Sequence, residues 1–268
     1  MSSTFRYGAN VQANGIRQHY LRYGGKGQPL VLVPGITSPA ITWEFVAERL
    51  GQQFDTYVLD VRGRGLSSTG PELAYDIDTC ADDIIAFTEA LNLQSYVLVG
   101  HSMGARFGIR AFTRGAAQME KLVLVDPPVS GPDRRPYPSK LPWYVDSIRA
   151  ATQGCGIDTM RDFCPTWTDE QLQLRAEWLH TCYEDAIVTT FNGFHEDDIH
   201  QDLPALRIPV LLMVAENGGV IQAEDEAEFR SLVPTIQINT VPDAGHMIPW
   251  DNFEGFFDGF ADFLGKAV

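Results

Sequence analysis

The chain has 268 residues, of which 20 are basic and 35 acidic, so its formal net charge is −15. Nucleic acids and anionic membranes require positive protein surface, and we therefore expect neither as a partner. The hydrophobic fraction of 44% and the length are typical of one large globular domain.

The N-terminus and the cysteines bear on the cellular location. Residues 1–10 contain no apolar segment, so we expect no signal peptide, and no apolar run approaches the length of about 18 residues that a membrane span needs. The cysteines are irregularly spaced and form no Cys-x-x-Cys pair; they are Cys80, Cys155, Cys164 and Cys182. This usage predicts reduced thiols in a cytoplasmic protein, without a structural zinc site.

The order of the predicted elements indicates the fold class. Two alternating segments, residues 5–12 and 16–23, flank Asn14-Gly15, which is typical of a β-hairpin. Short apolar runs then predict strands buried on both faces, at residues 30–33, 56–59, 96–99, 121–125, 210–214 and 236–241. Helical patterns separate them, at residues 43–50, 77–91, 104–114, 224–232 and 253–264. This alternation predicts an α/β protein with a mostly parallel, doubly wound central sheet.

Residues 128–203 interrupt the alternation because they contain no strand pattern. The stretch opens with a proline-rich run and continues with helical patterns over residues 143–151 and 169–191. A connection of this length predicts a small helical lid subdomain, inserted into a core formed by residues 1–127 and 204–268. Its aromatic residues either form the core of that subdomain or cover a crevice at the carboxyl ends of the strands.

Ser102 is the candidate nucleophile. It is the central residue of Gly100-His101-Ser102-Met103-Gly104, which follows a predicted buried strand and opens a predicted helix. In this context the Gly-x-Ser-x-Gly pattern predicts a strained turn that lifts the serine hydroxyl out above the sheet. Negative charge developing there would also be favoured by the N-terminus of the helix.

A serine nucleophile needs a base and an oxyanion hole, and the sequence offers candidates for both. His246 lies in a loop after the last predicted strand, in the chain order Ser…acid…His, whereas the His101 ring is expected to point elsewhere. The strand at residues 30–33 ends in Pro34-Gly35, so the Ile36 N–H can face the oxyanion. The Met103 N–H is the predicted second donor.

These motifs, together with Asp60-Val61-Arg62-Gly63-Arg64-Gly65-Leu66-Ser67, resemble the α/β-hydrolase superfamily over essentially the whole chain. Within it, the chain is similar to the N-formylmaleamate deformylases of bacterial nicotinate degradation. The resemblance implies a serine hydrolase that cleaves a linear amide C–N bond by acyl transfer to water, converting N-formylmaleamate to maleamate and formate. Such a mechanism requires no metal or organic cofactor.

The acid of the triad departs from the usual pattern. Most superfamily members carry it after the strand that follows the lid, but here residues 215–219 have glycine at the expected place. Asp126 directly follows the strand at residues 121–125, where the deformylase resemblance also implies an acid. We predict Asp126 as the third member, with Glu216 as its rival.

The substrate is less well defined by the sequence. We expect a small, carboxylate-bearing amide, with Arg106, Phe107 and Trp250 as candidate substrate contacts and with Ile36, Phe107 or Trp250 as walls of a tight acyl pocket. Arg134, Arg135 and Arg149 are further candidates for the carboxylate. Carboxylesterases, enol-lactonases and C–C bond hydrolases of aromatic catabolism share the scaffold, as would a non-catalytic ligand receptor. His195 and His200 are five residues apart, which does not match a zinc-binding helix, so we expect a solvated acidic turn there.

Overall fold

The computed structural model describes residues 3–265 and begins with the predicted hairpin. β1 (Phe5–Ala13) pairs antiparallel with β2 (Ile16–Tyr23). The intervening Asn14 and Gly15 both have positive φ, +48° and +72°, which is the backbone geometry of a type I′ turn. Asparagine and glycine tolerate this conformation, and the hairpin prediction is therefore confirmed.

Within residues 3–265, eight strands form a single sheet in the order β1-β2-β4-β3-β5-β6-β7-β8. The strands after the hairpin are β3 (Pro29–Val33), β4 (Asp55–Leu59), β5 (Tyr96–His101), β6 (Met119–Val125), β7 (Val210–Ala215) and β8 (Gln237–Val241). β2 runs antiparallel to β4, and the remaining neighbours are parallel. The α/β-hydrolase fold predicted from the sequence is confirmed.

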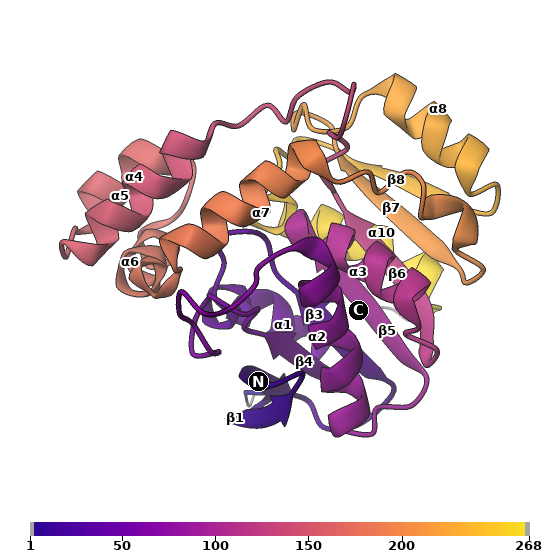
Figure 1. The fold of residues 1–268 in the computed structure, drawn as a ribbon, viewed down its shortest axis with the longest axis horizontal. Helices are drawn as coiled ribbons and strands as arrows, with labels where there is room; N and C mark the ends of the chain where they lie inside the picture. The colour runs from indigo at the N-terminus through magenta and orange to yellow at the C-terminus, as the bar shows by residue number, and fades with distance from the viewer. Residues whose placement is uncertain (1–2, 266–268) are drawn as a thin grey trace.

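Helices cover both faces of the sheet (Figure 1). α2 (Ile77–Ala90), α3 (Met103–Arg114) and α8 (Ala223–Leu232) pack on one face, and α1 (Glu44–Leu50) and α10 (Phe253–Leu264) on the other. Alternate residues of the central strands point into these two apolar layers: Leu98 and Leu122 into the first, Val97 and Val123 into the second. Burial on both faces explains why these central strands have nearly continuous apolar sequences. The expectation of burial on both faces was wrong for β8, where Gln237 and Thr240 are exposed because this strand lies at the edge of the sheet.

Residues 126–209, between β6 and β7, contain helices and no strand. The helices are α4 (Leu141–Thr152), α5 (Ile157–Phe163), α6 (Asp169–Trp178) and α7 (Glu184–Glu196), with the 3₁₀ turns η2 (Leu179–Thr181) and η3 (Leu203–Ala205). α5 was not expected, and the helix predicted over residues 169–191 is broken at η2. The break has a tertiary cause, because the Tyr183 N–H donates to the Gly63 carbonyl at 2.8 Å instead of continuing the helix.

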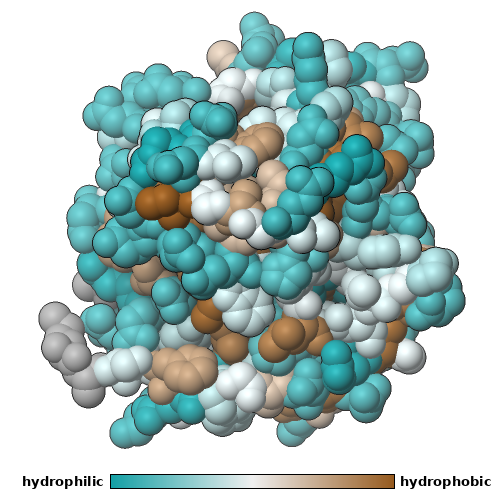
Figure 2. All heavy atoms as spheres, turned by 90° about the vertical axis from the view of Figure 1, so that its left-hand side faces the viewer, coloured by the Kyte–Doolittle hydropathy of each residue, from teal (hydrophilic) through white to brown (hydrophobic). Residues whose placement is uncertain are grey.

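α4, α5 and α6 lie together beyond the edge of the sheet, and α7 leads from them back over it (Figure 1). α6 also contacts η1 (Ala40–Trp43), which precedes α1. The face turned outward on this side is mainly hydrophilic, with scattered hydrophobic side chains (Figure 2). Large apolar residues of this segment pack inward, since Tyr144, Leu172 and Leu179 are buried. Within residues 3–265, no helix combines the length and the apolar character that a membrane crossing requires.

Candidate active site

The nucleophile candidate lies in a tight turn between β5 and α3. Ser102 has φ +52° and ψ −114°, a strained conformation for a residue other than glycine. A Cβ on Gly104 would lie 2.0 Å from the Val33 carbonyl oxygen, and one on Gly100 would lie 2.4 Å from the Gly104 carbonyl oxygen. The Ser102 N–H donates to the Val125 carbonyl at 2.8 Å. Close backbone approach thus explains both glycines and fixes the serine at the carboxyl edge of the sheet.

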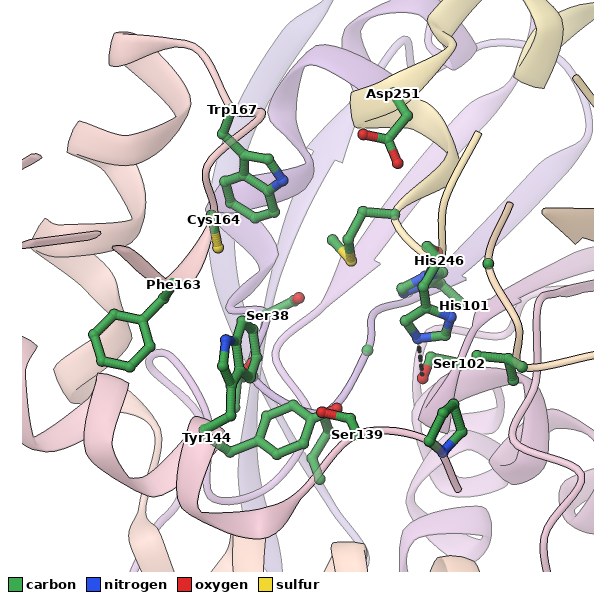
Figure 3. A pocket seen from close by; sticks show the side chains of 18 of the residues that line it. Ser38, His101, Ser102, Ser139, Tyr144, Phe163, Cys164, Trp167, His246 and Asp251 are labelled. Atoms are coloured by element: carbon green, nitrogen blue, oxygen red, sulfur yellow. Dashed lines mark hydrogen bonds between the residues drawn. The ribbon is translucent and has the colours of Figure 1, made fainter. Parts of the chain in front are cut away.

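A continuous chain of hydrogen bonds joins Ser102, His246 and Asp126. His246 Nδ1 lies 2.7 Å from Asp126 Oδ2. His246 Nε2 lies 3.0 Å from Ser102 Oγ, the contact drawn as a dashed line in Figure 3. A carboxylate only accepts, so Nδ1 carries the proton and the Nε2 lone pair accepts from the serine hydroxyl. Ser102 is only 1% exposed, so the hydroxyl that the turn lifts above the sheet lies inside a cavity and not at an open surface.

Asp126 is fixed by the neighbouring strand. It follows β6 directly, has φ +45° and is fully buried. Its N–H donates to the Met213 carbonyl at 2.9 Å, and its Oδ1 lies 3.3 Å from the Ala215 N–H. Both partners belong to β7, so the end of β6 and the edge of β7 together aim the carboxylate at His246.

The rival acid lies elsewhere. Glu216 is exposed and accepts from the Asp243 N–H at 3.0 Å. In contrast, a Cβ on Gly218 would lie 3.2 Å from Asp126 Oδ2. The loop after β7 therefore still faces the same histidine, but the carboxylate beside it comes from the end of β6.

His101 packs against the His246 loop and does not point away from the site as expected. Its Nε2–H donates to the His246 carbonyl at 3.0 Å, and the two imidazole rings lie 5.0 Å apart. Burial, with a smaller contribution from the neighbouring His246, lowers the pKa of His101 to about 3. The ring is therefore neutral and holds the loop that carries His246.

The two predicted oxyanion donors have free N–H groups. Neither the Ile36 N–H nor the Met103 N–H forms a hydrogen bond within residues 3–265. Ile36 lines the cavity, and its carbonyl accepts from Arg64 Nε at 3.1 Å. Asp60 holds the same loop further along, because its Oδ1 accepts from the Ala40 N–H at 2.6 Å. The Asp-x-Arg-Gly-x-Gly motif thus positions the loop that carries one donor.

The cavity beside Ser102 has a volume of about 400 Å³. It lies between the carboxyl edge of the sheet and the helical segment, as expected for an open α/β sheet. Its walls come from residues 35–38, the turn at residues 101–102, residues 137–139 and 143–144, residues 163–167, Arg175 of α6, the loops after β7 and β8, and Asp251 of the short helix α9 (Ile248–Asp251). Figure 3 shows Phe163, Cys164 and Trp167 across the cavity from Ser102 and His246.

Tyr137 is one of the aromatic residues of the predicted lid, and the sequence analysis gave it no role beside His246. Its hydroxyl lies 3.2 Å from His246 Nε2 and accepts from the Tyr144 hydroxyl at 3.4 Å. Burial raises the pKa of Tyr137 well above 10, so the phenol stays protonated and can donate. The sequence placed it among the lid aromatics, in the proline-rich run that follows Asp126, and nothing there indicated a contact with His246.

The structure does not bring the predicted substrate contacts to this cavity. Arg106 is buried elsewhere and donates to four backbone carbonyls, those of Pro128, Ser130, Gly193 and Asp197. Phe107 lies with it beside a separate small cavity next to α7. Trp250 stacks on Trp167 with 5.2 Å between ring centroids, so it lies behind the cavity wall. Of the expected walls of the acyl pocket, only Ile36 lines the cavity.

The arginines suggested for the carboxylate are also engaged elsewhere. Arg134 pairs with Glu228, Arg135 with Asp225 and Arg149 with Glu184. None of the three lines the cavity. The cationic side chain that does line it is Arg175, which the sequence did not single out.

The histidine-containing stretch that begins in the last turn of α7 differs partly from the expectation of a solvated turn. His200 is buried, and its Nδ1 lies 3.1 Å from Asp198 Oδ1. His195 is half-buried, with Nδ1 3.2 Å from the Phe191 carbonyl. In the part of the chain that the structure describes, no cluster of three His, Cys, Asp or Glu side chains could hold a metal ion.

The fold and the geometry of the site are those of an α/β-hydrolase, and comparison with known proteins leads to the same class. Residues 28–253 match the family described as alpha/beta hydrolase fold. The chain belongs to this family and is a hydrolase that acts on a small molecule.

The named relatives narrow the class. The chain is 71% identical to the N-formylmaleamate deformylase of Pseudomonas putida over 266 residues, 99% of each sequence. It is 26% identical to the 2-(acetamidomethylene)succinate hydrolase of Mesorhizobium japonicum, over 85% of this chain and 84% of that protein. Among solved structures, that of the N-formylmaleamic acid deformylase from Pseudomonas putida S16 superposes with a TM-score of 0.92 at 56% identity, covering 94% of this chain and 99% of that one.

Proposed function

We propose that the chain is an N-formylmaleamate deformylase, which hydrolyses its substrate to maleamate and formate. The observation that carries this proposal is the hydrogen-bonded chain Ser102–His246–Asp126 at a cavity sized for a small molecule. The fold accepts many substrates, and the 71% identity to a deformylase over nearly the full length of the chain supports this particular one.

In the first half of the reaction Ser102 Oγ attacks the formyl carbon while His246 Nε2 takes the serine proton. The tetrahedral intermediate collapses when His246 returns that proton to the amide nitrogen. The C–N bond breaks, maleamate leaves as a primary amide, and the formyl group remains as an ester on Ser102. Asp126 keeps the Nδ1 proton in place and stabilises the imidazolium that forms in between.

In the second half, water takes the place of the serine hydroxyl. His246 accepts the proton of the water as its oxygen attacks the formyl ester, and then returns that proton to Ser102 Oγ. Formate leaves and the free enzyme is restored. In both halves the Ile36 and Met103 N–H groups are the proposed donors to the oxyanion, and their lack of other partners supports this role.

The proposed substrate suits a site of this kind because its leaving group is an amide. The second carbonyl of an N-acylated amide shares the electron pair of the nitrogen, so this C–N bond breaks more readily than that of a simple alkyl amide. Tyr137 supports the same step, since its protonated hydroxyl lies beside His246 Nε2, where the leaving nitrogen must receive its proton. A cytoplasmic location, and partners limited to a small anionic amide, remain part of the proposal.

The test is product analysis with purified protein. N-formylmaleamate should give formate and maleamate in equal amounts, and Ser102→Ala should reduce the rate at least about 10³-fold while retaining the melting profile of the wild type. Turnover of short esters or enol-lactones without release of formate would contradict the proposal and favour the alternative hydrolases. No turnover of any of these compounds would favour the ligand receptor.

A further inference from the structure

Arg175 has an unusual environment for a buried cation. It lies on α6, is 4% exposed and lines the cavity. Its guanidinium lies 5.4 Å from the Trp143 ring centre and 5.5 Å from that of Trp167. Its hydrogen bonds are two long ones of 3.4 Å, both to Thr37, and its buried Nε has no partner. Within residues 3–265 no carboxylate forms an ion pair with it.

The other buried arginines of the chain form more and shorter hydrogen bonds than Arg175 does. Arg62 forms a bidentate pair with Asp83. Arg64 donates from all three nitrogens, and Arg106 donates to four carbonyls. Arg175 is the least satisfied of the four, and the only one that lines the cavity beside Ser102. A buried cation needs an anionic or polar partner, and a ligand in the cavity that Arg175 lines can supply one.

We propose that Arg175 binds the carboxylate of the substrate, so that the site selects short amides bearing a carboxylate at the end opposite the scissile bond. The inference rests on the proposed function for the identity of the substrate. A guanidinium presents its N–H groups as a planar fork that matches two carboxylate oxygens, and the rings of Trp143 and Trp167 lie against this group.

The layout of the cavity supports this orientation. Figure 3 shows Trp167 across the cavity from Ser102 and His246, and Arg175 contacts that tryptophan. The substrate carboxylate would thus lie on the far side from the nucleophile, with the formyl group at Ser102. Arg175 is the cation among the lining residues, and Asp251 is the carboxylate. In a chain of net charge −15, a small anion needs such a local cation.

The test uses a neutral reporter, so that binding of the anion is read separately from its turnover. Hydrolysis of p-nitrophenyl acetate is followed in the presence of maleamate, which bears a carboxylate, or maleamide, its neutral diamide. We expect maleamate to inhibit the wild type at least about tenfold more strongly than maleamide, a difference of about 1.4 kcal/mol. Arg175→Gln should raise the inhibition constant of maleamate at least about tenfold. It should leave that of maleamide, and kcat/KM for the ester, within about threefold.

Two further variants control the comparison. Arg149→Gln removes an exposed arginine paired with Glu184 outside the cavity, and should change none of these constants. Arg175→Lys retains the charge but loses the planar fork, so it should raise the inhibition constant of maleamate to a value between those of the wild type and Arg175→Gln. If the glutamine variant does not fold, the lysine variant is compared with the wild type in its place. Equal inhibition by maleamate in wild type and variants would overturn the inference. So would a parallel loss of ester hydrolysis and maleamide binding, which would assign Arg175 to holding the loop at Thr37.

The same variants separate this inference from the proposed function. If maleamate inhibition depends on Arg175 but the wild type releases no formate from N-formylmaleamate, the carboxylate site stands and the deformylase assignment fails. If formate is released and Arg175→Gln leaves KM for N-formylmaleamate unchanged, the function stands and the carboxylate site fails.

Discussion

Replacing Asp126 by asparagine isolates the charge of the buried acid. Asparagine has the same shape and tolerates positive φ as well as aspartate does, so the backbone at φ +45° has no reason to move. The change acts at the 2.7 Å contact with His246 Nδ1. If the asparagine NH₂ faces the ring, Nδ1 must accept, the ring proton moves to Nε2, and the serine loses its base.

The size of the effect follows from this change of tautomer. The corresponding substitution in the Ser-His-Asp triad of serine proteases lowers kcat about 10⁴-fold, which corresponds to a barrier about 5.5 kcal/mol higher. Asp126 is fully buried, so no water is available to replace the lost acceptor. We therefore expect Asp126→Asn to lower kcat for N-formylmaleamate by about 10³- to 10⁴-fold with little change in KM.

Glu216→Gln is the matched control because it is also an isosteric amide replacement. Glu216 is exposed, and glutamine can still accept from the Asp243 N–H, so kcat should stay within about threefold of wild type. Both variants are compared by steady-state kinetics and by thermal melting. A folded Asp126→Asn that keeps a tenth of the wild-type kcat, or a folded Glu216→Gln that loses a hundredfold, would refute the assignment of the acid.

Two further residues of the site give predictions. Tyr137→Phe should lower kcat for N-formylmaleamate about tenfold, because it removes one hydroxyl donor beside His246. Tyr144→Phe is the matched control, since it removes the neighbouring hydroxyl that donates to Tyr137. A kcat of Tyr137→Phe equal to that of the wild type would argue against this role. His101 has a pKa of about 3 when folded and about 6.5 when unfolded, so its contribution to stability is complete above pH 6.5 and declines as the pH falls toward 3. Urea unfolding is measured at pH 7.5 and at pH 5. Between these two pH values the free energy of unfolding should fall by about 2 kcal/mol more in the wild type than in His101→Gln. Equal losses of unfolding free energy would contradict the cause given for the low pKa.

The fold could be predicted because its local signals agree with its tertiary environment. Asn14-Gly15 specifies the hairpin turn by its backbone preference, and strands buried on both faces have continuous apolar sequences. The prediction was wrong where a distant contact decides the local structure. The helix expected over residues 169–191 breaks because Tyr183 bonds to Gly63, a residue more than a hundred positions away in the chain.

The residues of the site likewise fall into those that local sequence predicts and those that only tertiary packing determines. Ser102 and His246 lie in motifs whose backbone geometry has a sequence signature, and the structure brings them within 3.0 Å of each other. Arg175 carries no such signature, because its relation to the cavity depends on where α6 packs. Arg106 follows the candidate nucleophile by one helical turn, which made it a candidate substrate contact. Its side chain instead satisfies four carbonyls, a pairing that only the packing of α7 and of the loop after β6 creates.

The central claim is that Ser102 carries the formyl group between the amide and water, and hydroxylamine partitioning tests it most directly. N-formylmaleamate and p-nitrophenyl formate have different leaving groups but would form the same formyl-Ser102 ester. With hydroxylamine present, the ratio of formohydroxamate to formate should therefore be identical for the two substrates and rise linearly with hydroxylamine concentration. Ratios that differ between the substrates would show that no common formyl-enzyme exists, and would contradict the mechanism.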